Sequence, residues 1–510
     1  MNGSTKSGSK GGFVPDTFGR DFAASFVVFL VAMPLCLGIA IASGVPPALG
    51  LVTGIIGGIV VGSFAGAPLQ VSGPAAGLAV LVFDLVQKHG LAALGPVVLL
   101  AGVIQFAGGL LKLGRYFRGV SPAVVHGMLA GIGAVILLQQ IHVLIDDSPR
   151  SDGIANMAAI PGAFLGLDDN GLQALLVGVV TIGAMLAWEK FKPGALRLLP
   201  GALIGVVAGT VVAVIGSLSI QRISVPSNLA AEVTLPTAES MSMLTDPSMI
   251  GLAFAFAFIA SAETLLSAAA VDKMQDRVQS KFDKELSAQG VGNFLCGLVG
   301  ALPMTGVIVR SSANVQAGAM TRASAIMHGI WILGFVSLLP FVLSLVPTAS
   351  LAGVLVVVGA KLIKVQDVQK LFHRYGPFPA LIWAVTFVLV VTTDLLTGVI
   401  VGLALTALEL LPQVRGMRLN VEEQKHAEDH HEVVLEGKAT AIAIRKVAGL
   451  LDRLPNHGRL RIDLTGLHYA DHTVSELMAD AIKRRRDRGV EVEVEHSDAP
   501  HHRKLASAMA

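Results

Sequence analysis

Two charged residues lie inside stretches that are otherwise apolar. Glu263 lies in residues 252–270 (LAFAFAFIASAETLLSAAA), and Arg310 lies in residues 301–319 (ALPMTGVIVRSSANVQAGA). An ionisable side chain at membrane depth is costly unless it faces a partner or a water-filled site, so both are candidate functional groups. Arg310 keeps its charge and could act as a fixed counter-charge for an anion. Glu263 could take up a proton or hold a cation, so the pair predicts an anion carrier with a coupling site.

Two apolar segments, 74–87 and 310–319, are too short to span a bilayer, since a spanning helix needs about 20 residues. Pro74 suits the first residue of a helix, and Ser311 suits a helix cap. If both segments are half-helices that meet near the midplane, their unpaired N–H groups form an anion site, to which Arg310 adds a full charge. We assign anion binding to residues of the two tips and of the first apolar run: Arg310, Ser311, Val309, Ser72, Gly73, Pro74, Ala75, Met33 and Pro34.

The first apolar run enters this site through residues 31–35 (VAMPL). Pro34 would kink a helix there and free a backbone carbonyl. The alternative is that the two helix breaks arise from packing alone, with Arg310 reaching out to the membrane surface.

Glu263 has a hydroxyl on the same helix face, because Ser267 follows one turn later. A carboxylate, a hydroxyl and carbonyls from a nearby helix break suit a hard cation such as Na⁺, and a buried carboxyl could carry H⁺ instead. The alternative is a structural ion pair between Glu263 and Arg310. We assign the coupling-ion site to Glu263, Ser267, Thr305 and Gly306, and we expect no other cofactor and no structural metal.

Composition places these residues in a membrane protein. The chain has 510 residues, 53% of them hydrophobic and 15% charged, with a mean hydropathy of +0.68, whereas soluble domains carry about 25% charge. Cys36 and Cys296 fall in apolar stretches and read as small hydrophobic residues. The sequence has no basic stripe with interleaved aromatic residues of the kind that binds nucleic acid. Fourteen apolar segments are predicted, at 22–41, 47–65, 74–87, 92–111, 121–142, 171–189, 197–218, 248–270, 286–303, 310–319, 323–345, 348–363, 377–393 and 397–413.

The two short segments are each third in a run of seven. Because seven is odd, the second run enters the membrane from the opposite side, which predicts a 7+7 inverted repeat. Lysines and arginines concentrate in alternate loops, which places both termini in the cytoplasm and makes the first run an uncleaved span. The loops at 143–170 and 219–247 are expected to be solvated connections. The basic loops are 112–118, 190–197, 273–284, 361–374 and 415–418.

Composition changes abruptly near the C-terminus. We expect a cytoplasmic N-terminal segment at 1–21, a transmembrane domain at 22–415, an exposed linker at 416–432 and a small α/β domain at 433–510. Strand-like and helix-like patterns alternate in the last part, with a final short helix around Leu505. Its many histidines lack metal-ligand spacing. No nucleophile elbow, phosphate loop or metalloprotease helix is present, so we do not expect an enzyme.

The chain resembles the SulP family of anion transporters. The resemblance covers about residues 15–500 and rests on DFAASFVVFLVAMPLCLGIAIASG, VSGPAAG, AETLLSAAAVD, SAQGVGNFLCG and VRSSANVQAG, together with the tail. It implies a polytopic all-α domain of 14 segments in a 7+7 inverted repeat, divided into core and gate subdomains. It also implies an anion site between segments three and ten, a cytoplasmic STAS domain, homodimers and elevator-like alternating access.

Individual positions match different branches of that family. Glu263 and Ser267 match the sodium site of the bicarbonate-importing cyanobacterial branch, where the acid is Asp, and Arg310 matches a basic residue of the animal branch. This mixture leaves Na⁺ coupling, H⁺ coupling and exchange open. The stretch LVAMPLCLGIAIASG is similar to bacterial members associated with carbonic anhydrases, which favours bicarbonate over sulfate. Thr473 matches the phosphorylatable position of STAS relatives, with a plain N-cap as the alternative.

The sequence therefore predicts a secondary transporter of small inorganic anions in the bacterial inner membrane. Its expected partners are bicarbonate or sulfate, the lipid bilayer, a second copy of the chain and, functionally, carbonic anhydrase. Two alternatives remain open. One is a dicarboxylate or nucleobase permease of the same fold, and the other is a membrane sensor or channel that signals through its tail.

Overall fold

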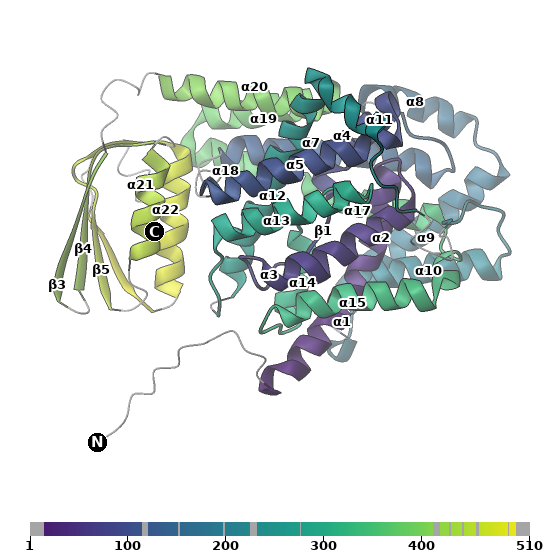
Figure 1. The fold of residues 1–510 in the computed structure, drawn as a ribbon, viewed down its shortest axis with the longest axis horizontal. Helices are drawn as coiled ribbons and strands as arrows, with labels where there is room; N and C mark the ends of the chain where they lie inside the picture. Colours follow the sequence, from purple (N-terminus) through teal and green to yellow (C-terminus); the bar gives the residue numbers. More distant parts are fainter. Residues whose placement is uncertain are drawn as a thin grey trace.

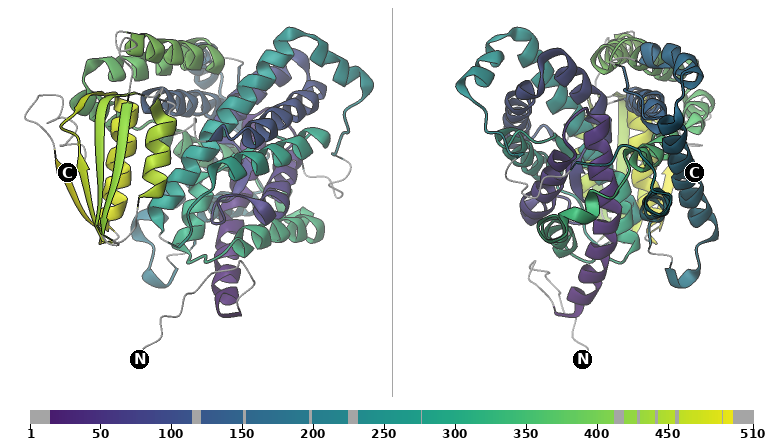
Figure 2. Two further views of the ribbon diagram at one scale, coloured as in Figure 1. Left: turned by 60° about the vertical axis from the view of Figure 1, so that its left-hand side comes forward. Right: turned by 90° about the vertical axis from the view of Figure 1, so that its right-hand side faces the viewer.

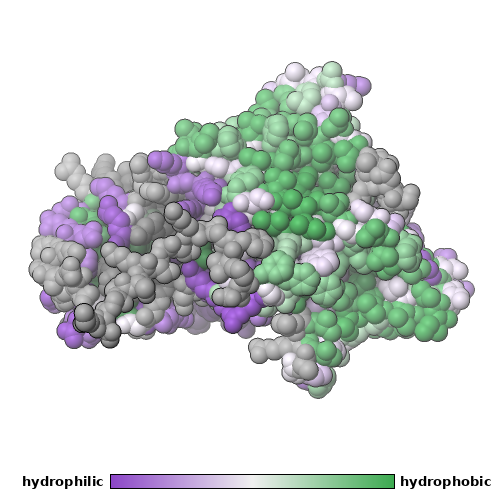
Figure 3. Space-filling view, turned by 60° about the horizontal axis from the view of Figure 1, so that its bottom comes forward, coloured by the Kyte–Doolittle hydropathy of each residue, from purple (hydrophilic) through white to green (hydrophobic). Residues whose placement is uncertain are grey.

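A helical domain and a smaller domain of strands and helices make up the protein (Figure 1). The computed structural model describes residues 15–114, 121–150, 153–196, 199–224, 232–275, 277–411, 419–427, 430–440, 443–454, 458–487 and 489–495. Among these residues, seven helices are long and apolar enough to cross a membrane, and five shorter apolar helices accompany them. Apolar residues cover most of the helical domain in Figure 3. The chain is therefore a mainly helical, polytopic membrane protein.

Over its described residues, the helical domain consists of helices, with one short strand in each of its two parts. Its first part contains α1 (Pro15–Ala42), α2 (Pro47–Ile55), a π-helix (Ile56–Val61), α3 (Gly62–Phe64), β1 (Ser72–Pro74), α4 (Ala76–His89), α5 (Leu94–Leu110), α7 (Pro122–Leu144), α8 (Gly153–Leu165), α9 (Asp169–Phe191) and α10 (Gly201–Ile215). Its second part contains α11 (Ala238–Ser242), α12 (Pro247–Met274), α13 (Phe282–Leu298), β2 (Met304–Gly306), α14 (Ile308–Gln316), α15 (Ala323–Leu338), α16 (Pro340–Leu343), α17 (Thr348–Leu362), α18 (Val365–Tyr375), α19 (Pro377–Thr392) and α20 (Leu395–Leu410).

The helices pack mainly as two sets. The α5–α13 set comprises α1 to α5 and α12 to α15, and the α7–α17 set comprises α7 to α10 and α17 to α20. Glycines let α5 and α13 approach at backbone distance: a Cβ on Gly102 would overlap the nitrogen of Phe294, and one on Gly290 would overlap that of Phe106. Such close contact holds α13 firmly against its neighbour, which matters because α13 reaches the candidate site.

The C-terminal domain contains β3 (Leu419–Ala427), β4 (His430–Ala439), α21 (Ile444–Arg453), β5 (Arg459–Asp463), β6 (Leu467–Ala470), α22 (His472–Asp487) and β7 (Glu491–Glu495). Its strands follow the order β3-β4-β5-β7, with β6 paired to β4. β3 and β4 are antiparallel, and the other pairs are parallel. Both helices lie on the side of the sheet that faces the helical domain (Figures 1 and 2).

Each of the fourteen predicted segments overlaps a helix, whereas their relation as an inverted repeat stays a prediction. The predicted linker at 416–432 is wrong over its described part, because residues 419–427 form β3 and pair along β4. The predicted solvated loop at 143–170 is also wrong, since it contains the apolar helix α8. Leu505 lies outside the described residues.

Candidate functional site

The two predicted half-helices begin from a pair of crossing strands. β1 and β2 are antiparallel, with Ser72 opposite Gly306 and Pro74 opposite Met304. The Val307 N–H extends the pairing by donating to the Val71 carbonyl at 2.9 Å. Every residue of both strands is buried. β1 leads directly into α4 and β2 into α14, so the two helix N-termini meet inside the helical domain.

Neither of these N-termini has a side-chain cap. α4 begins after Ala75, and α14 begins after Val307, with no capping hydrogen bond at either position. The first N–H groups of such helices need other acceptors. In α4 the Glu263 carboxylate faces one of them, the Gly77 N–H.

Two neighbouring residues do not occupy the helix positions predicted for them. Pro74 lies in β1 rather than at a helix start, and Ser311 lies inside α14 rather than at its cap. Its hydroxyl accepts the Val71 N–H at 2.9 Å and donates to the Val307 carbonyl at 2.8 Å.

Arg310 is fully buried directly behind the crossing strands. None of its three guanidinium nitrogens has a hydrogen-bond acceptor among the described residues. A Cβ on Gly73 would overlap its Nη1 atom, so the Nη1 end of the guanidinium lies directly against the backbone of β1. The Cys36 thiol on α1 lies beside it, and His328 on α15 is within electrostatic range. Because Arg310 is 0% exposed, the alternative that it reaches the membrane surface is wrong.

The missing side chain at Gly73 gives a direct test of this arrangement. The Gly73→Ala variant is expected to raise the anion concentration for half-maximal uptake on the order of tenfold, because the new methyl must displace the guanidinium. Uptake kinetics in vesicles measure this. Gly62→Ala is the control, since its Cβ would make only ordinary contacts at 3.5 Å. Wild-type kinetics in Gly73→Ala would show that the Arg310 guanidinium does not lie against the backbone at Gly73.

Glu263 belongs to α12, and its carboxylate lies against the first turn of α4 rather than beside Arg310. Its Oε2 atom would be 2.6 Å from a Cβ on Gly77, and its carboxylate also interacts with the Thr305 side chain on β2. No ion pair or hydrogen bond joins Glu263 to Arg310, so the alternative of a structural pair between them is wrong. Ser267 is 1% exposed and Thr305 is 0% exposed. The Glu263 Oε2 and Ser267 Oγ atoms lack a hydrogen-bond partner among the described residues. Thr305 Oγ1 faces the Glu263 carboxylate without forming a well-aligned hydrogen bond.

The side-chain oxygens of Glu263, Ser267 and Thr305 are of the kind that would bind a cation or, at Glu263, a proton. The Gly306 N–H, by contrast, is already donated to Thr264 Oγ1 at 3.1 Å. Among the described residues, no group of three or more His, Cys, Asp or Glu is placed to hold a metal ion. A lone carboxylate with neighbouring hydroxyls fits a weakly held Na⁺ or a transferable proton.

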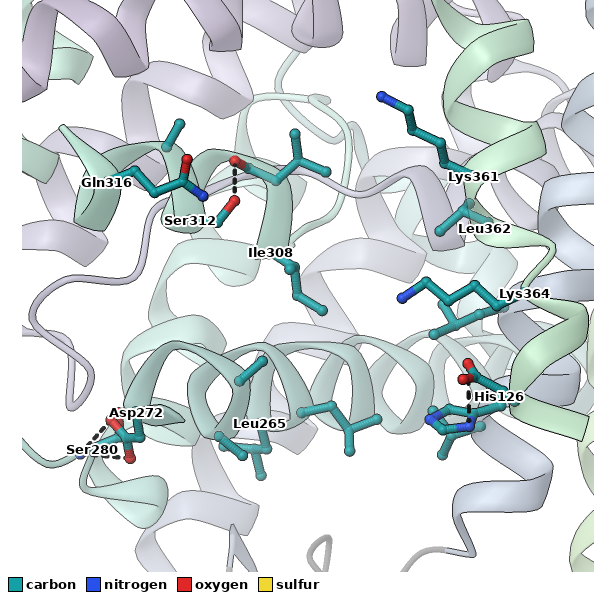
Figure 4. Close-up of a pocket in the computed structure, with 18 of the residues that line it drawn as sticks. His126, Leu265, Asp272, Ser280, Ile308, Ser312, Gln316, Lys361, Leu362 and Lys364 are labelled. Atoms are coloured by element: carbon teal, nitrogen blue, oxygen red, sulfur yellow. Dashed lines mark hydrogen bonds and ion pairs between the residues drawn. The ribbon is translucent and has the colours of Figure 1, made fainter. Parts of the chain in front are cut away.

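A cavity of about 750 Å³ separates the two helix sets and reaches the tip of α14 (Figure 4). We call it the vestibule. Ile308 and Val309 are 40% and 50% exposed and face it. Lys361 and Lys364 extend into it, and His126 is paired with Asp367 at 3.6 Å on its wall. Residues of α22 line it as well, so it opens toward the C-terminal domain.

Most of the predicted anion residues do not face the vestibule. Of the nine, Val309 alone lines it, whereas the other eight lie elsewhere. Met33 and Pro34 are on another face of α1, whose Val27, Val31 and Leu35 are the lining residues. Helix α1 runs through Pro34 without ending. The sequence placed residues 31–35 at the site but gave no signal that Val31, Leu35 or Ile308 would line a cavity. Apolar residues in an apolar helix look alike whether they face lipid, protein or a cavity.

Thr473 is 3% exposed, and its hydroxyl has no hydrogen-bond partner among the described residues. It lines the vestibule from the first turn of α22. The N-cap interpretation of Thr473 is wrong, because Asp471 Oδ1 accepts the Val474 N–H at 2.8 Å and so caps the helix.

Comparison with known proteins gives consistent matches. Residues 18–386 match the sulfate permease family. YvdB of Bacillus subtilis, named as a sulfate transporter, is 30% identical over 458 residues, covering 87% of this chain and 82% of its own. The bicarbonate transporter BicA of Picosynechococcus is 26% identical over 398 residues, covering 75% of this chain and 68% of BicA.

Solved structures show the same fold. The transmembrane domain of a cyanobacterial bicarbonate transporter, BicA, matches with a TM-score of 0.65 and 25% identity, covering 76% of this chain and 98% of that domain. SLC26A9 matches with a TM-score of 0.69 and 16% identity, covering 97% of this chain and 87% of the other.

Proposed function

Since this chain belongs to the sulfate permease family, we propose that it is a secondary active transporter of a small inorganic oxyanion, bicarbonate ahead of sulfate. The family consists of transporters rather than enzymes, and the relatives named above are sulfate and bicarbonate transporters. Anion transport by a multi-pass membrane protein is therefore the established part of this function. The substrate, the coupling ion and the mechanism are our proposal.

One observation carries the proposed anion site: two uncapped helix N-termini meet in front of a buried, unpaired guanidinium. Each N-terminus carries about half a positive charge. At α4 the Gly77 N–H already faces the Glu263 carboxylate, and the remaining first-turn N–H groups are left for an anion. Arg310 does not need to touch the anion. Its charge acts across the thickness of β1 at Gly73, where no side chain intervenes, in surroundings with little water to screen it. A singly or doubly charged oxyanion would relieve this uncompensated charge.

We assign the coupling ion to the neighbouring oxygens. Glu263 adjoins Gly77 in the first turn of α4, so it shares that helix start with the anion. A negative carboxylate there would oppose anion binding unless Na⁺ or H⁺ neutralises it. Binding of cation and anion would thereby favour each other, which is what coupled transport requires. Ser267 and Thr305 would complete the cation's oxygen shell.

Alternating access would follow from the two helix sets. We propose that the α5–α13 set carries the crossing strands past the α7–α17 set in an elevator-like movement. The vestibule between the sets supports this, because it gives the α14 tip a path toward the C-terminal domain. We further propose that both termini are cytoplasmic, that the protein acts as a homodimer in the bacterial inner membrane, and that a carbonic anhydrase consumes or supplies its bicarbonate.

Uptake into proteoliposomes tests the substrate and the coupling. We expect concentrative uptake of radiolabelled bicarbonate, with weaker uptake of sulfate, when an inward Na⁺ or H⁺ gradient is imposed. Chloride and fumarate serve as competitors, and liposomes without protein correct for passive entry of CO₂. Uptake of fumarate alone would favour a dicarboxylate permease. Absence of flux for every anion would contradict the proposal.

A further inference from the structure

We infer that Gln289 and Asn293 of α13 are the positioning residues of the anion site: they fix the two crossing strands and thereby set anion affinity. The inference rests on the proposed function for its effect on affinity. Its structural part, the fixing of β1 and β2, stands on hydrogen bonds alone. Neither residue lines the vestibule, so neither is a candidate to touch the anion itself.

Gln289 fixes β1 at Ser72. Its Nε2 donates to the Ser72 hydroxyl at 2.6 Å and to Glu285 Oε1 at 2.9 Å. The other carboxylate oxygen of Glu285 accepts the Ala67 N–H at 2.8 Å, on the segment that leads into β1. Gln289 and Glu285 are 0% exposed, and Ser72 is 4% exposed. One buried pair of side chains therefore holds β1 and its approach at two points.

Asn293 fixes β2 at Met304 in the manner of an additional strand. Its Oδ1 accepts the Met304 N–H at 2.7 Å, and its Nδ2 donates to the Met304 carbonyl at 3.0 Å. The same Nδ2 donates to Gln105 Oε1 at 2.7 Å, and Gln105 Nε2 donates to the Ser261 hydroxyl at 3.1 Å. The chain of amides thus continues to α12, two residues before Glu263.

The spacing explains how one helix can fix both strands. Glu285, Gln289 and Asn293 follow each other at intervals of four residues and so form one row along α13. Ser72 is paired with Gly306 at one end of the two-stranded sheet, and Met304 is paired with Pro74 at the other. The row on α13 therefore hydrogen-bonds to the sheet at both ends, through Gln289 and Asn293. Because α13 is itself fixed to α5 at backbone distance, the row transmits that rigidity to the two tips.

Replacing Gln289 by Met keeps the side chain's length and removes both of its donors. We expect Gln289→Met to raise the KM for the transported anion about tenfold, the order of effect for losing the one buried hydrogen bond that reaches β1 at Ser72, with kcat nearly unchanged. Ser287→Ala is the matched control on another face of α13, where its hydroxyl donates to the Asp283 carbonyl at 3.2 Å. This control should keep the wild-type KM.

A double-mutant cycle separates positioning from general destabilisation. Ser72→Ala removes the partner with a minimal change, so the double variant Ser72→Ala/Gln289→Met should have a KM no higher than that of the worse single variant. Independent, multiplicative effects of the two changes would overturn the inference. So would a wild-type KM in a folded Gln289→Met protein.

Hydrogen–deuterium exchange tests the structural part without any transport. We expect the backbone of residues 66–73 to exchange faster in Gln289→Met, and that of residues 302–306 in Asn293→Leu, while Ser287→Ala matches the wild type. Unchanged exchange in both strand segments would overturn the fixing of the strands. If wild-type vesicles transport no anion although exchange responds as expected, the proposed function fails and the positioning of the strands stands.

Discussion

The Arg310→Ala variant is expected to lose anion uptake while remaining folded. Among the described residues, Arg310 supplies the full positive charge at the crossing strands. In surroundings of low polarity its loss should weaken anion binding by about 100-fold or more. Its guanidinium has no carboxylate or carbonyl partner among the described residues and lies beside the Cys36 thiol, so its removal breaks no ion pair. Deleting an uncompensated buried charge should leave the melting temperature of the detergent-purified protein equal or higher.

Two measurements on purified protein decide this prediction. Binding of radiolabelled anion should disappear in Arg310→Ala, and a thermal unfolding assay should show no loss of stability. Arg310→Lys is the matched control: it keeps the charge on a shorter, more strongly hydrated group, so we expect partial binding. Normal uptake by Arg310→Ala would remove the guanidinium from the proposed site, and a large drop in melting temperature would make its role structural.

The Glu263→Gln variant is expected to lose concentrative uptake and to keep exchange of anion across the membrane. The amide preserves the shape beside Gly77 and Thr305 but can neither be protonated nor neutralise a cation. The anion site itself stays in place, so anion should still move down its own gradient. Vesicles loaded with unlabelled anion measure the exchange, and an imposed Na⁺ or H⁺ gradient measures accumulation.

Ser267→Ala separates the two coupling ions. A bound Na⁺ would lose an oxygen ligand, so Na⁺-driven uptake should need a higher Na⁺ concentration, whereas H⁺-driven uptake should be little changed. Accumulation of anion against its gradient by Glu263→Gln would show that Glu263 is not the coupling residue. Loss of exchange as well as accumulation would place Glu263 in anion binding.

Much of the fold could be predicted from the sequence, because helices that cross a lipid bilayer need long apolar stretches. Fourteen apolar segments each overlap a helix, since a bilayer requires apolar side chains over a fixed length. Helix α8 was missed because its 13 residues are too few for a span and lie in a loop bordered by polar residues. Strand β3 was missed because residues such as Glu422, Glu423 and Lys425 read as a solvated linker. A strand at the edge of a sheet tolerates such charges.

Only about half of the candidate site could be predicted from the sequence. Glu263 and Arg310 stood out because charge in an apolar stretch is unusual, and the short helices stood out by length. The direction of Arg310 could not be predicted, because one residue of rotation about a helix decides between the vestibule and the space behind β1. The polar row on α13 is visible as a four-residue spacing, yet its partners Ser72 and Met304 are distant in sequence.

Locating the bound anion tests the central claim most directly. A structure determined with saturating transported anion, or with selenate as the heavy analogue of sulfate, should place the anion at the N-termini of α4 and α14. We expect it within hydrogen-bond distance of their first N–H groups, on the opposite side of Gly73 from Arg310. An anion found only among the vestibule lysines Lys361 and Lys364, with the helix tips empty, would contradict the account.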